Sequence, residues 1–154
     1  MLYVARADAY EAPVISTSEA LLRYLHLDMA REPVERFRVL FLNAQNRLLH
    51  ETVADGCVSE APVYPREIMR RALDVGATAL ILVHNHPSGD PTPSQTDIRS
   101  TQRIAEAGQA LDISVHDHVI IARSGWSSFR ALGLLGRQEK KHRLFRRPAK
   151  GLAA

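Results

Sequence analysis

The sequence predicts an α/β sandwich, a mixed sheet with helices packed on its faces. The main observation is the run at residues 77–83, which is apolar on both faces, as expected of a central strand covered on both sides. The second is the order of the segments around it, because a hairpin, a helix, this strand, a helix and a further strand follow one another.

The first expected elements are a helix and a hairpin. Ser16 and Glu19 form the S-x-x-E pattern of a capping box and predict a helix over residues 17–30. Residues 37–42 and 48–53 alternate as strands around a turn-forming segment, which predicts a hairpin. The apolar residues of the helix recur at the spacing of one buried face: Leu21, Leu22, Leu25 and Met29.

The second half of the chain continues the pattern. Pro65 is favoured at a first helical position and Gly76 stands where a helix would stop, so a second helix is expected between them. After the buried strand and a loop rich in proline and glycine, a third helix is expected over residues 93–111. Residues 113–122 alternate as a strand, and residues 126–132 add a short strand and a turn.

Length and composition indicate one soluble domain. The chain has 154 residues, 45% of them hydrophobic, which suits a single core. No apolar run approaches the ~20 residues of a membrane helix, and the first residues lack a secretion signal, so we expect a cytoplasmic protein with no membrane partner. The single cysteine, Cys57, cannot form an internal disulfide, and we interpret it as a small, partly buried residue rather than a catalytic thiol.

The formal net charge of +3 is unevenly distributed. Residues 137–154 carry seven lysines and arginines against one glutamate, a charge of +6, whereas the remainder of the chain is net acidic. This basic tail could contact the phosphates of a nucleic acid, although charged termini are more often only solvated.

A candidate metal site begins at the end of the buried strand. His84 and His86 are two residues apart, so both imidazoles project from the same face of a strand and can serve as nitrogen ligands. Ser94 and Asp97 lie three residues apart at the start of the third helix, and a short loop could fold that helical face over the histidines. Asp97 is therefore a candidate third ligand.

Two interpretations of this helix start remain open. Thr92 as the cap, with Pro93 at the first helical position, would leave Ser94 and Asp97 free for chemistry. Alternatively, Ser94 is the cap and Asp97 completes an S-x-x-D box, a purely structural use of the same residues. Local chemistry does not separate the two.

The spacing H-x-H-x7-S-x2-D, which joins His84 and His86 to Ser94 and Asp97, is the JAMM motif of MPN+ metalloprotease-like domains. The surrounding words, His84 to Ser94 (HNHPSGDPTPS), Val63-Tyr64-Pro65-Arg66-Glu67 and Asp117-His118-Val119-Ile120-Ile121, resemble the bacterial RadC family, long labelled as DNA repair proteins. The resemblance runs from about Val34 to Leu132.

The resemblance implies a three-layer α/β/α sandwich of the MPN or cytidine-deaminase-like kind, with one zinc ion held by His84, His86 and Asp97 and a water in the fourth position. It also implies an upstream glutamate that deprotonates this water, for which Glu35 matches the family segment and Glu67 is the alternative. Ser94 would help to stabilise the oxyanion. The implied reaction is hydrolysis of a peptide or isopeptide bond, with a peptide or an isopeptide-linked protein as substrate.

The alternative function is a nucleic-acid-associated DNA-repair module whose metal site is structural or vestigial. Most RadC proteins carry an amino-terminal helix-hairpin-helix region, and we expect this chain to be a short form without it, which weakens the DNA-repair label. The expected organisation is a helical extension at residues 1–32, the JAMM domain at 33–136 and a basic, flexible tail at 137–154. His116 and His118 share a strand face, where either could orient a metal ligand, but a purely structural role is favoured.

Overall fold

A computed structural model describes residues 18–55 and 64–136. Every helix and strand expected from the sequence within these residues is present, with ends shifted by one to a few positions. The elements are α1 (Ser18–Met29), β1 (Arg36–Leu42), β2 (Leu48–Asp55), α2 (Pro65–Val75), β3 (Ala79–Asn85), α3 (Gln95–Ala110), β4 (Ser114–Ala122) and β5 (Gly125–Ser128). Ser16, Cys57 and the basic tail lie outside the described residues, and the predicted division into domains stays a prediction.

The strands form one five-stranded sheet in the order β2-β1-β3-β4-β5. β1 pairs with β3 antiparallel, whereas β3 pairs with β4 parallel, so the sheet is mixed as expected. β3 is the central strand and all seven of its residues are buried. Its run of residues that are apolar on both faces reflects this central place.

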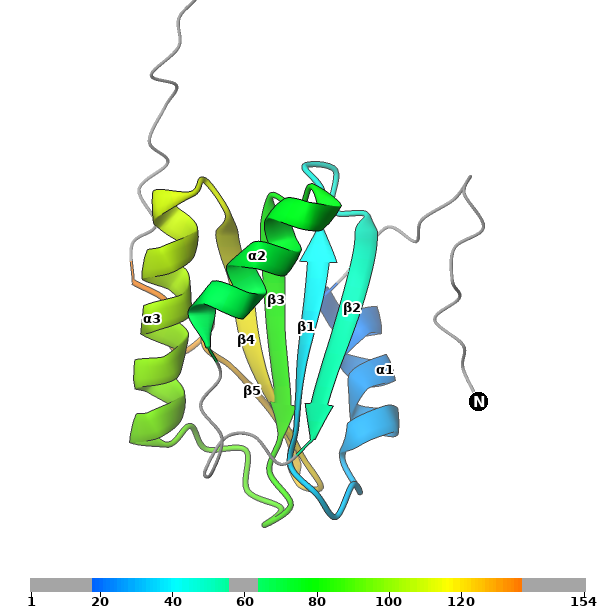
Figure 1. Cartoon of the computed structure of the whole chain (residues 1–154). Helices are drawn as coiled ribbons and strands as arrows, with labels where there is room; N and C mark the ends of the chain where they lie inside the picture. The colour runs from blue at the N-terminus through cyan, green and yellow to red at the C-terminus, as the bar shows by residue number, and fades with distance from the viewer. Residues whose placement is uncertain (1–17, 56–63, 137–154) are drawn as a thin grey trace, which may run out of the picture.

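Helices cover both faces of the sheet, which confirms the three-layer α/β/α architecture (Figure 1). α1 packs on one face through Leu25 and Met29, against Leu40 and Val83. α2 and α3 pack on the other face through Met69 and Ile104, among others. No helix in the described part of the chain is long and apolar enough to span a bilayer.

The helices α2 and α3, which form one layer, have different N-terminal caps. α2 starts with Pro65 and ends at Gly76, whose φ of 71° is the left-handed conformation that glycine adopts most easily. α3 has Ser94 as its N-cap, so the interpretation with Thr92 as the cap is wrong. Ser94 Oγ accepts a hydrogen bond from the Asp97 N–H, and the Asp97 carboxylate accepts one from the Ser94 N–H. Ser94 is the cap rather than Thr92 because Ser94 and Asp97 satisfy each other's backbone N–H groups at the start of the helix.

Candidate metal centre

The end of β3 brings two histidines together. His84 is fully buried at the end of the strand, and His86 stands at the start of the following loop, half-buried. Because side chains alternate along the strand, both rings lie on the α2 and α3 side, and the Nε2 atoms are 2.9 Å apart. The sequence prediction that the two imidazoles point together is confirmed.

Asp97 reaches the same point from the first turn of α3. Its Oδ1 lies 3.3 Å from Nε2 of His84, and its Oδ2 lies 3.4 Å from Nε2 of His86. The carboxylate also accepts the Ser94 N–H at 2.7 Å, so one side chain both caps the helix and faces the histidines. The capping role and the position beside the histidines, which were alternatives for Asp97 in the sequence, are therefore combined in one carboxylate: Oδ2 accepts the Ser94 N–H and faces His86, and Oδ1 faces His84.

The electrostatics of these groups favour an anionic aspartate. Burial by itself raises the pKa of the Asp97 carboxyl, but hydrogen bonds from His84 and His86 outweigh burial and hold that pKa well below its usual range. The hydrogen bond to Asp97 raises the pKa of His86, against the opposing effect of burial. A buried carboxylate thus supplies a permanent negative charge at the point where the two imidazoles meet.

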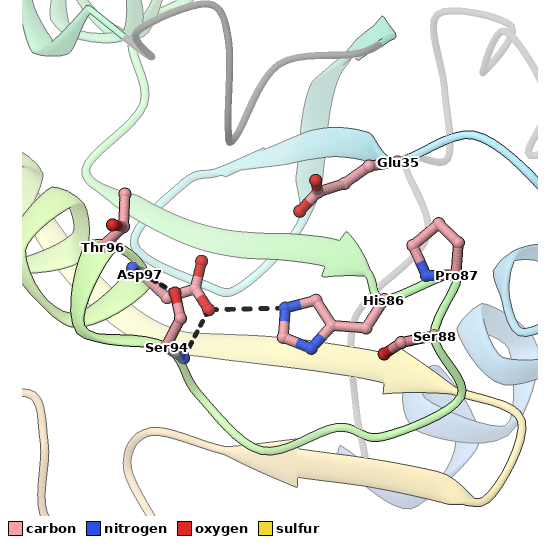
Figure 2. Close-up of a pocket in the computed structure, with 7 residues that line it drawn as sticks. All are labelled: Glu35, His86, Pro87, Ser88, Ser94, Thr96 and Asp97. Atoms are coloured by element: carbon pink, nitrogen blue, oxygen red, sulfur yellow. Dashed lines mark hydrogen bonds and ion pairs between the residues drawn. The ribbon is translucent and has the colours of Figure 1, made fainter.

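Glu35, the residue immediately before β1, completes the cluster. Its Oε1 lies 3.8 Å from Nε2 of His84, and Glu35, His84 and His86 each offer a ligand atom within 4.8 Å of the others. Figure 2 places the Glu35 carboxylate across the cleft from Asp97 and Ser94. The alternative, Glu67, is exposed on α2, where its carboxylate pairs with Arg70 at 3.2 Å, and it does not line this cleft.

The second ring nitrogens show that the set suits a metal cation. His86 Nδ1 lies 2.8 Å from the Asp90 carbonyl, an acceptor only, so Nδ1 carries a proton and donates it. Its Nε2 then faces Nε2 of His84 at 2.9 Å and the Asp97 carboxylate at 3.4 Å. Without a metal, a proton at this point supplies the hydrogen bonds to Asp97, and a bound cation would take the place of that proton between the two nitrogens. Two imidazoles oriented in this way beside a carboxylate match the nitrogen and oxygen ligands of zinc sites.

A hydrogen-bonded chain orients His84 from behind. Thr101 Oγ1 donates to the Asp97 carbonyl at 2.7 Å and can therefore accept from His118 Nδ1, 2.5 Å away. His118 Nε2 in turn accepts from His84 Nδ1 at 2.7 Å, which leaves the Nε2 of His84 free for the metal. Burial, followed by repulsion from His84, lowers the pKa of His118, as this neutral tautomer requires.

His118, for which a purely structural role was favoured, thus contacts a candidate metal ligand directly. The expectation that His116 shares a strand face with His118 is wrong, because a bulge in the pairing of β3 with β4 turns His116 to the α1 side of the sheet, where its Nε2 donates to Asn46 Oδ1 at 3.1 Å. Thr101 was missed by the sequence analysis. The available signal was its position one helical turn after Asp97, on the same face of α3.

The site opens into a cleft of about 460 Å³. Ser94 is exposed at its wall, together with Ser88 from the loop after β3, and Figure 2 shows Ser94 beside Asp97 and Ser88 beside His86. The Ser94 oxygen already accepts the Asp97 N–H, so its own hydroxyl proton remains available to a molecule in the cleft. The arrangement thus combines a candidate metal site with a neighbouring carboxylate, that of Glu35, and a hydroxyl donor.

The mixed sheet between helical layers, with histidines at the end of the central strand, defines a JAB or MPN domain. The family model of the RadC-like JAB domain matches residues 15–134, and the chain belongs to this family. It is 53% identical over 133 residues to a UPF0758 protein of Rhodobacter capsulatus, covering 86% of this chain and 62% of the relative. A UPF0758 protein of Ruegeria pomeroyi is also 53% identical over 133 residues, which cover 86% of this chain and 59% of that protein. The chain thus spans about three fifths of the length of these relatives.

Proposed function

We propose that this protein is a zinc-dependent hydrolase of the JAMM type that cleaves a peptide or isopeptide bond. The observation that carries the proposal is the convergence of His84, His86 and Asp97, with distances of 2.9 to 3.4 Å between their ligand atoms. Glu35 lies beside them, with its Oε1 3.8 Å from Nε2 of His84. Three protein ligands with a fourth position open to water are typical of a catalytic rather than a structural zinc site.

Each residue has a distinct task in this proposal. His84, His86 and Asp97 would hold the ion, which when bound lowers the pKa of a water towards ~7. Glu35 accepts the proton of the attacking water and passes it to the leaving amine. Ser94 donates its hydroxyl proton to the developing oxyanion, since its oxygen is held by the Asp97 N–H and cannot rotate away freely.

The lining of the cleft does not by itself select a substrate. Its wall contains the carboxylates of Glu35 and Asp97, and among the described residues no lysine or arginine lines it. A bound zinc ion would offset these two charges, so the choice of substrate class rests on the JAMM motif. A peptide or isopeptide-linked protein is therefore the substrate class that we propose.

Metal analysis tests the first step of the proposal. Purified wild-type protein should contain or bind one zinc ion per chain, and His84→Ala should bind none under the same conditions. Wild type would then be screened against fluorogenic peptides and isopeptide-linked lysine substrates, with and without a chelator. Wild type that binds no zinc, or hydrolysis that survives both the chelator and His84→Ala, would overturn the proposal.

A second proposal concerns the basic tail and rests on its +6 charge at residues 137–154. In that proposal the tail binds nucleic acid through phosphate contacts, and the metal centre serves a structural role. Deletion of the tail should then abolish binding to a double-stranded DNA probe and its dependence on salt. Unchanged DNA affinity after the deletion would remove this alternative.

A further inference from the structure

Asn85, the residue between the two histidines, points to the opposite side of the strand and bonds to the segment before β1. It is 1% exposed, and strand alternation turns its side chain away from the face that holds His84 and His86. Its Oδ1 accepts a hydrogen bond from the Arg36 N–H at 2.7 Å. Its Nδ2 donates to the carbonyls of Val34 at 3.0 Å and Glu32 at 3.3 Å. The oxygen and the nitrogen of this one carboxamide thus both bond to the backbone of one segment, residues 32–36.

These backbone groups enclose Glu35. The Val34 carbonyl belongs to the peptide group before Glu35, and the Arg36 N–H belongs to the peptide group after it. Planar peptide groups leave only φ and ψ to set the direction of a side chain, so holding both neighbours fixes the direction of the Glu35 Cα–Cβ bond. The hydrogen bonds therefore fix where the Glu35 side chain starts and in which direction it leaves the backbone, and its Oε1 lies 3.8 Å from His84 Nε2.

The sheet itself does not hold Glu35 in this way. β1 begins at Arg36, and its antiparallel pairing with β3 ends at Phe37 opposite His84. The next position in this register would place Arg36 opposite Asn85, where the side-chain amide takes over from the ladder of backbone hydrogen bonds. The segment with Glu35 lies beyond the last paired residue, and the Asn85 carboxamide fastens it to the end of the central strand.

We infer that Asn85 is a positioning residue that holds the Glu35 carboxylate at the metal centre. The inference deepens the proposed function and rests on it for what Glu35 does there. A general base acts only within hydrogen-bond reach of its proton, and a misplacement of about 1 Å can lower the rate about 100-fold. The residue between the ligands therefore sets the place of the base, although it touches neither metal nor substrate.

The test compares Asn85→Ala with Asn43→Ala in the full chain. Asn43 Oδ1 accepts from the backbone N–H groups of Gln45 and Arg47 at 2.9 and 3.0 Å, in the turn after β1. The control therefore loses similar side-chain to backbone hydrogen bonds at the far end of the same strand. Asn85→Leu is a second variant, which keeps about the volume of the buried side chain and loses the three hydrogen bonds without leaving a cavity.

Crystal structures of the zinc-loaded variants provide the first measurement. In Asn85→Ala and in Asn85→Leu the Glu35 carboxylate should move by about 1 Å or more, with His84, His86 and Asp97 in place. Amide exchange at Arg36 should accelerate at least about tenfold in Asn85→Ala and stay unchanged in the control. A carboxylate that superimposes on the wild-type position in both Asn85 variants would overturn the inference.

Visible spectra of the Co²⁺-substituted proteins provide a measurement that a loss of general stability would not move. Asn85→Ala should reproduce the spectral change of Glu35→Gln, and adding it to Glu35→Gln should produce no further change. Independent, additive changes would contradict the inference. If Glu35→Gln alters neither the spectrum nor hydrolysis, the proposed role of Glu35 is wrong, and the position of its carboxylate in the Asn85 variants still decides this inference.

Discussion

The Nδ1 atom of His84 lies 2.7 Å from Nε2 of His118, a residue 34 positions later on the neighbouring parallel strand. This contact decides the tautomer of His84, because a neutral His118 that donates to Thr101 can only accept at Nε2. Phe129 stacks on the His118 ring with centroids 4.6 Å apart and keeps its plane in place. One buried, uncharged imidazole thus orients a candidate metal ligand.

We expect His118→Phe to weaken zinc binding about tenfold to 100-fold, the usual cost of losing the partner of a metal-bound histidine. Phenylalanine keeps a ring against Phe129 but offers no acceptor to His84. Zinc affinity would be measured by competition with a chromophoric chelator. His116→Gln, on the same strand outside the chain of hydrogen bonds, is the control and should bind zinc like wild type. Equal affinity in both variants would contradict the role of His118.

We expect Glu35→Gln to lower hydrolysis about 10²- to 10⁴-fold while zinc remains bound, because the amide cannot accept the proton of the water. The measurement is the rate with a peptide or isopeptide probe that wild type cleaves, together with the zinc content. Glu67→Gln is the matched control and should keep the wild-type rate, because Glu67 pairs with Arg70 on the surface of α2. A larger loss in Glu67→Gln would reverse the assignment of the base.

Asp97→Asn should separate the two tasks of this side chain. The asparagine oxygen can still accept the Ser94 N–H, so α3 keeps its capping box, but the negative charge is lost and zinc affinity should fall at least about tenfold. Ser94→Ala should do the reverse, lowering the free energy of unfolding by about 0.5–2 kcal/mol with zinc still bound. Chelator competition and urea denaturation measure the two effects. Equal loss of zinc in both variants would argue against Asp97 as a ligand.

Gly108→Ala should destabilise the fold. An added Cβ would lie 2.4 Å from the backbone oxygen of Ile113, where the end of α3 packs on the chain entering β4. Neither backbone can yield without disturbing the core, so we expect a loss of about 1–3 kcal/mol in the free energy of unfolding. Gln109→Ala, at the next and exposed position, is the control. An unfolding midpoint in urea shared by Gly108→Ala and wild type would show that the site has more room than the structure indicates.

His116 should make the metal-free protein less stable at mildly acidic pH. Burial and then the charge of Arg130 lower the pKa of His116 below its ordinary 6.5. Between the two pKa values the unfolded chain binds more protons, so this contribution is complete above pH 6.5 and is lost as the pH falls towards the folded pKa. Urea denaturation should show a smaller rise in stability between about pH 5.5 and 7 for His116→Gln than for wild type.

The same shift can be measured directly. In a ¹H–¹⁵N titration, Arg130→Gln should raise the pKa of His116 towards its ordinary value, because the repulsion from the guanidinium is removed. A pKa that stays unchanged in Arg130→Gln would assign the whole effect to burial.

Local patterns in the sequence were sufficient for the elements and for part of the site. The helical and strand periods predicted all eight elements found within the described residues, since each period reflects which side of one element is buried. The pairing of His84 with His86 followed from strand alternation alone. The recruitment of Asp97, and the choice of Glu35 over Glu67, came from spacing and from the resemblance to the RadC family rather than from local physics.

The tertiary structure decided what depends on contacts between distant segments. It joined the cap and ligand roles of Asp97 and placed His118 behind His84 through the parallel pairing of β3 with β4. It also placed the Asn85 side chain within hydrogen-bond distance of a backbone segment about 50 residues earlier. A sequence period reports how a residue faces its own helix or strand. Which residue of another strand meets it is set by the register of the sheet, and no local pattern encodes that register.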